Sequence, residues 1–395
     1  PNVQIDAWAV YTNNPVCGAF RGFGAAQGCL AIEGHMSEMA ARLGMDEIEF
    51  RQRNLVRQGE RTAMGHILPL PIAVDQALEA ARRHPLWREG RQASAGAGRI
   101  RRGVGVAVGM KGYCLGMGGM PDYGAADLEL DADGSYRLGL GIIDLGQGSF
   151  TALAQMAAEA LHCRLDQVRV SAADTARNQD SGTTAASRVT YAAGRAVLAA
   201  AEELERNILA AAAVELSAPA DRLAIAGDSV CDADGRPRLT LRDLAGRVAA
   251  PLRAASRQPV PLADQPASGA LAHPHALYSS NVQLAQVAVD TETGEVQVER
   301  VVAFPEVGQV INRAGLEGQM EGGVAQGVGY ALLEDLLLKD GRILNPDFAG
   351  YPIPTSLDTP AVETLPVEVP EASGPFGAKG AAENATLPTA PAILD

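Results

Sequence analysis

Short glycine-rich turns stand directly before expected helices at four places in the sequence. They lie at residues 18–27, 146–151, 181–190 and 315–323, and each carries Gln, Ser, Thr or Arg. Glycine lets the backbone approach a bound group closely, and the N–H groups at a helix start bind phosphate and other oxygen-rich ligands. No turn matches a dinucleotide fingerprint or a P-loop. The pattern therefore predicts a chain folded around something large and polar.

A further glycine-dense stretch, Gly374–Glu383, delivers one carboxylate among small side chains. Gly377, Gly380 and Ala382 leave room around Glu383 and let a ligand come close to the backbone. A glutamate with such small neighbours is poorly placed for core packing. Glu383 is therefore the candidate functional acid, and a solvated carboxylate at a helix start is the alternative.

Composition excludes several classes of protein. The chain has 395 residues, 47% of them hydrophobic, and a formal net charge of −14, which suits a globular protein of two or three domains. Nucleic-acid binding is excluded because phosphate contacts need a basic surface, and the one basic run is the short stretch 99–102. No apolar stretch is long enough to span a bilayer and no signal segment opens the chain, so we expect a cytoplasmic protein.

The five cysteines and six histidines are scattered. The cysteines form no CxxC pair, and we interpret the closely spaced His273 and His275 as part of a loop. Neither a disulfide framework nor an iron–sulfur site is expected. Any metal is therefore not held by a cage of Cys and His side chains.

Hydrophobic periodicity predicts the elements of the first hundred residues. A strand is expected over residues 2–10, a helix ending at Gly44, and a second helix to about residue 55. Four residues on one face of the first helix are expected in the core: Ile32, Met36, Met39 and Leu43. A linker rich in glycine, alanine, serine and arginine at residues 90–102 marks the expected domain boundary.

Beyond this linker the pattern alternates between strands and helices. We expect a meander of three strands, at residues 103–110, 126–130 and 136–145. Further elements are expected as a helix over 149–161, a long helix ending near residue 216, a hairpin over 282–301 and a helix over 315–335. The last helix carries so many glycines that something must pack closely against its backbone.

Taken together and in order, five motifs resemble the molybdopterin-binding subunit of the xanthine dehydrogenase and aldehyde oxidoreductase family of molybdenum hydroxylases. They are GAFRGFG at 18–24, GQG at 146–148, DSGTTAAS at 180–187, EGQMEGGVAQG at 317–327 and GAKGAAE at 377–383. The resemblance spans the whole chain. It implies an α+β fold of mixed sheets, with helices whose N-termini converge on an elongated molybdopterin. Residues 1–95 would end a first molybdopterin-binding domain, and residues 100–395 would form a second.

The resemblance also implies a reaction. Members of this family hydroxylate a carbon beside a ring nitrogen, or an aldehyde carbon, with water as the oxygen source. A glutamate deprotonates the hydroxyl on molybdenum, and hydride passes to a sulfido or selenido ligand of the metal. The metal acidifies its hydroxyl, so a carboxylate of ordinary basicity can serve as the general base. Glu383 matches that glutamate.

The same resemblance assigns roles to other residues. Arg21 matches the arginine of the loop beneath the metal, and Phe23 matches the aromatic that packs on a flat substrate ring. The remaining matches are expected cofactor contacts: Ala19, Phe20, Gly146, Gln147, Gly148, Ala186, Ser187, Thr190 and Gln319. Alternatives are a surface arginine in a turn for Arg21 and simple helix capping for Ser187 and Thr190.

Departures from the family pattern are also informative. Gly22 stands where the carbon monoxide branch has a cysteine, which disfavours carbon monoxide oxidation. Ala26, Arg313 and Ala382 replace residues that are usually Pro, Pro and Gly. The chain begins about twenty residues before Arg21, so the family's Gly-Gly-Phe-Gly-Gly loop near the metal is expected on a partner chain.

We therefore expect a split molybdenum hydroxylase subunit in a hetero-oligomer. The expected partners are a chain supplying the first half of the subunit, a 2Fe-2S subunit and an FAD subunit, which carry electrons away from the metal. The expected cofactor is molybdopterin in its cytosine dinucleotide form. N-heteroaromatic substrates, nicotinate- or purine-like, are favoured, and residues 116–120 are expected near the substrate. Aldehyde oxidation and a non-catalytic scaffold role are the alternatives.

Overall fold

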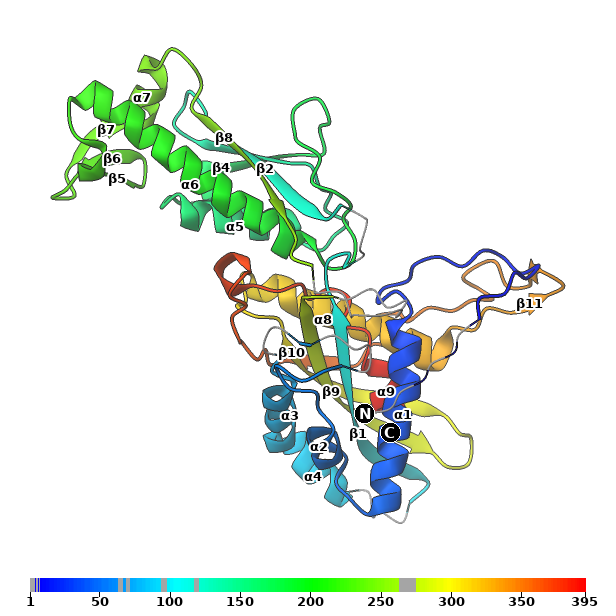
Figure 1. Cartoon of the computed structure of the whole chain (residues 1–395). Helices are drawn as coiled ribbons and strands as arrows, with labels where there is room; N and C mark the ends of the chain where they lie inside the picture. The colour runs from blue at the N-terminus through cyan, green and yellow to red at the C-terminus, as the bar shows by residue number, and fades with distance from the viewer. Residues whose placement is uncertain are drawn as a thin grey trace.

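The computed structural model describes residues 4, 6, 8–62, 67–68, 72–93, 98–116, 121–262 and 275–395, with residues 91–93 described by their backbone alone. The described chain forms an inner lobe and an outer lobe, at the bottom and top of Figure 1. It enters the outer lobe after the first strand of the inner lobe and returns before the second.

The inner lobe contains α1 (Ala25–Leu43), α2 (Glu47–Arg53), α3 (Val74–Arg83), α4 (Pro85–Ala93), β1 (Ile100–Gly112), β9 (Tyr278–Asp290), β10 (Val296–Glu306), α8 (Arg313–Val328), β11 (Leu338–Lys339), β12 (Arg342–Ile343), β13 (Ala361–Thr364) and α9 (Thr389–Leu394). Its main sheet has the order β1-β9-β10-β13, antiparallel except for the parallel pair β10 and β13. A π-helical turn, Gly329–Leu333, follows α8 directly.

This sheet is covered on both faces, and the alternation of side chains along β1 shows how. Val106 packs with residues of α2, α3 and α4 in one hydrophobic core. Its neighbour Ala107 packs with residues of α8 and α9 in another, because successive side chains of a strand point to opposite faces. Helices α2 to α4 thus share a core with β1, β9 and β10, and the linker predicted at 90–102 does not coincide with a break in that core.

The outer lobe contains β2 (Tyr123–Leu130), β3 (Tyr136–Leu140), α5 (Ser149–Ala160), β4 (Val168–Ala172), α6 (Val189–Leu216), β5 (Leu223–Ala226), β6 (Ser229–Asp232), β7 (Pro237–Thr240), α7 (Leu241–Arg247) and β8 (Arg253–Pro259). Its main sheet has the order β4-β3-β2-β8, and α5 and α6 cover it with a continuous apolar core. The small β5-β6-β7 sheet and α7 lie at the far end of α6 (Figure 1).

Several expected elements are confirmed, including the helices α5 and α6, the β9–β10 hairpin and the pairing of β2 with β3. The three-stranded meander is wrong. β1 pairs along all of its length with β9, whereas β2 pairs with β3 and β8 in the other lobe. β1 is apolar on both faces, so it needs a sheet covered on both sides, and the distant β9 provides its neighbour.

The predicted core face of α1 is also wrong. Ile32, Met39 and Leu43 are 63%, 44% and 66% exposed. The helix instead buries small residues and Glu33, whose carboxylate accepts hydrogen bonds from Arg51 at 2.7 Å and from the Val108 N–H at 2.8 Å. The face of α1 that carries the Glu33–Arg51 ion pair therefore packs against the rest of the lobe, and the apolar stripe of the helix faces solvent.

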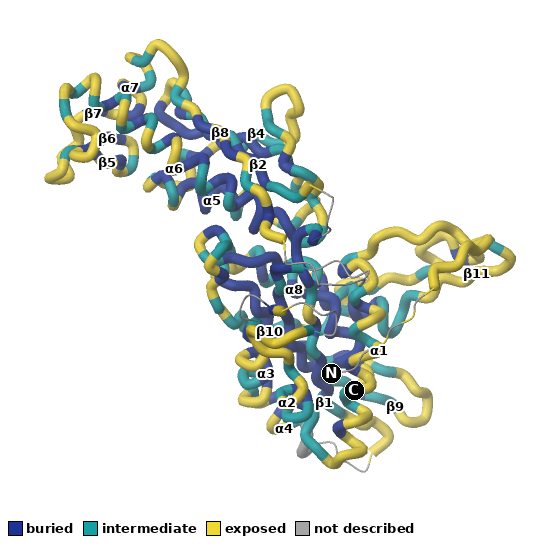
Figure 2. Tube along the Cα trace, viewed as in Figure 1, coloured by how far each residue is buried: buried dark blue, intermediate teal, exposed yellow. Residues whose placement is uncertain are grey.

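The opening segment does not form the expected strand where it is described. Residues 4, 6 and 8–12 are exposed and carry no strand, and the other residues of the prediction lie outside the description. Figure 2 shows this segment and the arm around β11 and β12 as mostly exposed. The two touch, since a Cβ on Gly341 would lie 2.4 Å from the Asn13 carbonyl oxygen.

Candidate active site

A cavity of ≈ 600 Å³ lies between the two lobes. The outer lobe lines it with residues 145–149 and 184–190, and the inner lobe with Arg21, residues of the 307–326 stretch and residues of the 378–383 stretch. The first residues of α5, α6 and α8 all reach it. Helix N-termini favour anionic and oxygen-rich groups, so the cavity suits a ligand bearing phosphate.

The structure brings together most of the site residues predicted from the sequence. Those lining the cavity are Arg21, Gly146, Gln147, Gly148, Ala186, Ser187, Thr190, Gln319 and Glu383. Ala19, Phe20 and Phe23 belong to the same loop as Arg21 but do not line the cavity, and all three are exposed. Residues 117–120, expected near the substrate, lie outside the described residues.

Arg21 links three segments of the inner lobe. Its Nε donates to the Ala382 carbonyl oxygen at 2.6 Å, and Nη2 donates to the carbonyl and side-chain oxygens of Gln319 at 3.1 and 3.0 Å. Nη1 donates to Gln326 Oε1 at 3.3 Å. Burial lowers the pKa of the guanidinium, and the charge of Glu383 opposes this. Arg21 therefore ties its loop to α8 and to the glutamate loop, and is not a surface arginine.

Glu383 is held from several sides. Its Oε2 lies 2.7 Å from the ammonium of Lys111 at the end of β1, and its Oε1 accepts the Gly22 N–H at 3.3 Å. Its own N–H donates to the Ser187 hydroxyl at 2.9 Å, across the two lobes. The Glu383 and Lys111 side chains are each 15% exposed. The carboxylate is thus neither a core residue nor a freely solvated acid.

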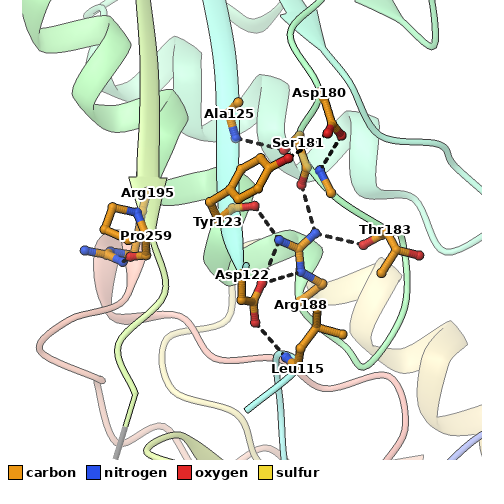
Figure 3. Close-up of polar contacts among 11 residues, drawn as sticks. Leu115, Asp122, Tyr123, Ala125, Asp180, Ser181, Thr183, Arg188, Arg195 and Pro259 are labelled. Atoms are coloured by element: carbon orange, nitrogen blue, oxygen red, sulfur yellow. Dashed lines mark hydrogen bonds and ion pairs between the residues drawn. The ribbon is translucent and has the colours of Figure 1, made fainter. Parts of the chain in front are cut away.

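The loop that carries Ser187 is fixed by a buried ion pair (Figure 3). The Arg188 guanidinium lies 2.8 Å from Asp122, and it also donates to the carbonyl oxygens of Ser181 at 2.9 Å, Thr183 at 2.8 Å and Tyr123. Because one side chain satisfies so many backbone acceptors, it sets the course of the loop before α6. Ser187 and the preceding residue both adopt left-handed backbone, with φ of 51° and 50°.

A second buried ion pair anchors the loop of Glu383. Lys379 Nζ donates to Glu306 Oε2 at 3.0 Å and lies 2.9 Å from Oε1, and both side chains are almost fully buried. Burial raises the pKa of Glu306, although the charge of Lys379 opposes this. Gly380 is required beside it, because a Cβ there would lie 2.1 Å from the Ser187 carbonyl oxygen.

The turn before α5 is organised by Asp144. Burial raises the pKa of this carboxyl, but hydrogen bonds from the N–H groups of Gly146, Phe150 and Gly148 hold it below its ordinary value. The Gln147 side chain accepts from the Leu145 N–H at 2.6 Å and so stays within the turn. Part of the anion-binding capacity predicted for this helix start is therefore occupied by the chain's own carboxylate.

Sequence reasoning missed Lys111, Lys379 and Arg188 as site residues. Lys111 has one visible signal, a charge at the end of the otherwise uncharged stretch 103–112. Lys379 and Arg188 lie inside quoted or adjoining motifs but carried no predicted role. Among the residues that the structure describes, no three His, Cys, Asp or Glu side chains gather into a metal site.

Comparison with known proteins identifies the class. Models of the molybdopterin cofactor-binding domain match residues 79–360 and 1–55. The chain is 31% identical to the putative xanthine dehydrogenase molybdenum-binding subunit of Escherichia coli K12, over 97% of this chain and 51% of the relative. It is 30% identical to the aldehyde oxidoreductase of Megalodesulfovibrio gigas, over 97% of this chain and 39% of that relative.

Solved structures agree with the sequence matches. Quinoline 2-oxidoreductase of Pseudomonas putida 86 superposes with a TM-score of 0.82 at 25% identity, over 95% of this chain and 49% of that one. The aldehyde oxidoreductase of Desulfovibrio desulfuricans superposes with a TM-score of 0.77 at 30% identity, over 95% of this chain and 38% of that one.

The fold and the site thus define a molybdopterin-binding protein of the α+β class. The chain belongs to the molybdenum hydroxylase large-subunit family that includes xanthine dehydrogenases and aldehyde oxidoreductases. It spans about half the length of the curated relatives that it matches. In the part of the chain that the structure describes, no helix is both long and apolar enough to cross a membrane.

Proposed function

We propose that this chain is the C-terminal half of the molybdopterin-binding subunit of a molybdenum hydroxylase, with Glu383 as the general base. The observation that carries this proposal is the position of the Glu383 carboxylate. It lines a cavity onto which three helix starts open, and it is held by Lys111, by the Gly22 N–H and, through its own N–H, by Ser187.

The bound cofactor supplies a Lewis-acidic metal that makes a coordinated hydroxyl reactive at ordinary pH. The residues of this chain bind and orient it. The starts of α5, α6 and α8 offer N–H groups to its phosphate, with Ser187, Thr190 and Gln319 beside them. Arg21 fixes Gln319 and the backbone just before Glu383, so the base and the binding surface move together. Glu383 would accept a proton at its carboxylate as the general base.

The cofactor is proposed to be the cytosine dinucleotide form of molybdopterin, and electrons are proposed to leave through 2Fe-2S and FAD subunits in a cytoplasmic complex. The Paenarthrobacter nicotinovorans relatives named nicotine 6-hydroxylase large subunit and 6-hydroxypseudooxynicotine dehydrogenase complex subunit gamma, each 28% identical, carry subunit names that support a multi-chain assembly. The network around Glu383 and Arg21 speaks against a non-catalytic scaffold, which has no need of a held carboxylate.

The proposed substrate is an N-heteroaromatic compound, nicotinate- or purine-like, oxidised beside a ring nitrogen. The names of the nicotine hydroxylase and xanthine dehydrogenase relatives support this class. Phe23 is proposed to pack on the substrate ring, from its exposed position beside the cavity. The alternative is an aldehyde, supported by the identity to the aldehyde oxidoreductase of Megalodesulfovibrio gigas.

A partner polypeptide equivalent to the first half of the relatives is proposed to complete the site. It would cover what we call the docking face: the exposed stripe of α1, the opening segment 8–18 and the arm 334–360. Large exposed apolar residues of this face are Trp8, Val10, Tyr11, Val16, Ile32, Met39, Leu43, Leu336, Leu337, Leu344, Phe348, Ile353 and Leu357. Apolar surface of this extent is rarely left open to water.

The test combines elemental analysis with one substitution. The protein, purified from its host with the chains that accompany it, is expected to contain near-stoichiometric molybdenum. Glu383→Gln should keep the metal and lose about 10²- to 10⁴-fold in turnover of N-heterocycles, because general-base catalysis contributes about that much. Glu321→Gln, an exposed glutamate on α8, is the matched control. If the wild-type complex contains molybdenum but hydroxylates neither heterocycles nor aldehydes, the non-catalytic scaffold role becomes the favoured function.

A further inference from the structure

The Glu383 carboxylate faces a lysine that none of the motifs contains. Lys111 ends β1, and its Nζ lies 2.7 Å from Glu383 Oε2. The same ammonium donates to the Gly112 carbonyl oxygen at 3.1 Å. Since the Gly22 N–H binds the other carboxylate oxygen, the two oxygens are held by different segments of the inner lobe.

Lysine is rare in this chain, which makes its position informative. The sequence has 33 Lys and Arg residues, of which only Lys111, Lys339 and Lys379 are lysines. Two of these three pair with carboxylates at the glutamate loop, Lys111 with Glu383 and Lys379 with Glu306. A lysine is a compact point charge, whereas arginine forms a planar fork that binds a carboxylate through two donors.

Burying an ammonium is unfavourable unless it is paired. Among the described residues, Glu383 is the acidic side chain within ion-pair distance of Lys111. Glu383 also interacts electrostatically with Arg21, from the loop before α1. Lys379 stands on the same loop but is bound to Glu306. The base therefore faces one cation from β1 and one from the loop before α1.

We infer that Lys111 is a positioning residue for the general base: its ammonium fixes the orientation of the Glu383 carboxylate in the cavity. This inference rests on the proposed function. A general base must point at the proton that it removes, and a fixed partner restricts rotation of the carboxylate away from that position. The proton would go to Glu383, and Lys111 would act only through its contact with that carboxylate.

The first readout needs no cofactor. Melting temperatures are measured for Lys111→Met, Glu383→Gln and the double variant in the complex, prepared from a host that cannot make molybdopterin. If the two side chains are paired, the melting temperature of the double variant falls by less than the sum of the decreases in the two single variants. If the Lys111→Met protein does not accumulate, Lys111→Gln replaces it in the same double-mutant cycle. Additive losses overturn the inference.

The second readout is the pair of constants kcat and KM, measured on the loaded complex. Lys111→Met is expected to lower kcat about tenfold or more with little change in KM, because the carboxylate is present but no longer held in its reactive orientation. Lys111→Arg keeps the charge and is expected to retain most of kcat. A purely structural lysine would lower the melting temperature without changing kcat per bound molybdenum, and an unchanged kcat in Lys111→Met overturns the inference.

The two readouts separate this inference from the proposed function. If the wild-type complex hydroxylates nothing, the proposed function fails, but the melting cycle still reports whether the pair exists. If Glu383→Gln abolishes turnover while Lys111→Met shows no coupling in the melting cycle and leaves kcat unchanged, the proposed function stands and the role of Lys111 is rejected.

Discussion

Ser187 shows how this site depends on single atoms. Its hydroxyl accepts the Glu383 N–H at 2.9 Å and is the side-chain link from the outer lobe to the base. The residue is left-handed, with φ of 51°, a conformation that costs a non-glycine residue roughly 1–2 kcal/mol. Arg188 holds the loop in that shape through its bonds to Ser181, Thr183 and Asp122. Local strain is thus maintained by a buried cation one residue away.

The two contributions of Ser187 can be separated with two substitutions. Ser187→Ala removes the hydroxyl and keeps the strain, whereas Ser187→Gly removes both. We expect both to lower kcat, since each frees the Glu383 N–H, at a net cost of roughly 0.5–1.5 kcal/mol for the hydrogen bond. Thermal unfolding should show Ser187→Gly to be the more stable, because glycine adopts this φ freely. Equal turnover in wild type and both variants would contradict the role of the hydroxyl.

Lys379 gives a pH-dependent prediction. In the folded protein, burial raises the pKa of Glu306 above its ordinary 4.5. A carboxyl of this kind contributes stability that is present below the unfolded pKa and is lost as pH rises through the folded one. Lys379→Met removes the counter-ion, so we expect a loss of about 3–5 kcal/mol at neutral pH. The loss should shrink as pH falls from neutral, because the raised pKa of Glu306 favours its uncharged form at mildly acidic pH.

Chemical denaturation across that pH range checks this expectation. The double variant Lys379→Met with Glu306→Gln is the control, because it leaves no buried charge and should lose the added pH dependence. A destabilisation of Lys379→Met that does not change between neutral and mildly acidic pH would show that packing of the lysine stem, rather than its charge, is what matters.

Among individual residues, the sequence predicts those site residues that belong to compact motifs. Glu383 was predicted because a glycine-dense stretch marks it, and Arg21 and Gln319 because their motifs resemble those of the family. The structure brings all three to one cavity. Lys111 and Arg188 escaped notice because their partners, Glu383 and Asp122, lie far away in the sequence. Pairing across that distance depends on the path of the chain, which periodicity does not reveal.

At the scale of elements, α8 is the clearest case in which sequence predicts packing. Its many glycines indicated a close neighbour, and the structure places the segment after Glu383 there. A Cβ on Gly323 would lie 2.4 Å from the Ala385 Cβ and 2.8 Å from the Ala385 carbonyl carbon, whereas a Cβ on Gly318 would meet nothing within 4 Å. The lack of a side chain at Gly323 thus lets the loop that carries Glu383 pack directly against the backbone of α8.

These two glycines make a matched pair of substitutions. Gly318→Ala is expected to stabilise the protein by about 0.5–1 kcal/mol, because alanine favours the helix and the position is open. Gly323→Ala gains the same propensity but collides with Ala385, and overpacking costs roughly 1–3 kcal/mol. We expect it to lower both the melting temperature and kcat. If Gly323→Ala were as stabilising as Gly318→Ala, α8 would not pack tightly on the loop.

The elements that were mispredicted share a physical cause. The apolar stripe of α1 looked like a core face, but Glu33 and its partner Arg51 take the inward side. β1 and β2 were predicted to be neighbours in a meander, but β1 pairs with β9 in the inner lobe and β2 pairs with β8 in the outer lobe. Local pattern fixes the type of element well. Which face turns inward, and which strand pairs with which, depends on groups outside the element.

For the whole molecule, the exposed apolar surface is unevenly distributed. Helix α1 and the opening segment leave large side chains in water on the same side of the inner lobe as the β11–β12 arm (Figures 1 and 2). The outer lobe, by contrast, closes its core around β2, β3, α5 and α6 within the chain itself. This asymmetry agrees with the proposal that a partner covers the docking face of the inner lobe.

The docking face can be tested without disturbing the site. Ile32 and Leu43 are exposed and point away from the core of α1, so replacing both with Gln should leave the melting temperature of the chain nearly unchanged. If the partner half buries them, each loses roughly 1.5–3 kcal/mol of apolar transfer, and affinity falls on the order of 100-fold or more. Val214→Gln, at an equally exposed apolar position on α6, is the matched control. Binding is measured by sedimentation with the chain equivalent to the first half of the relatives. Unaltered binding by the double variant would place that partner elsewhere, and the open stripe of α1 would then need a different occupant.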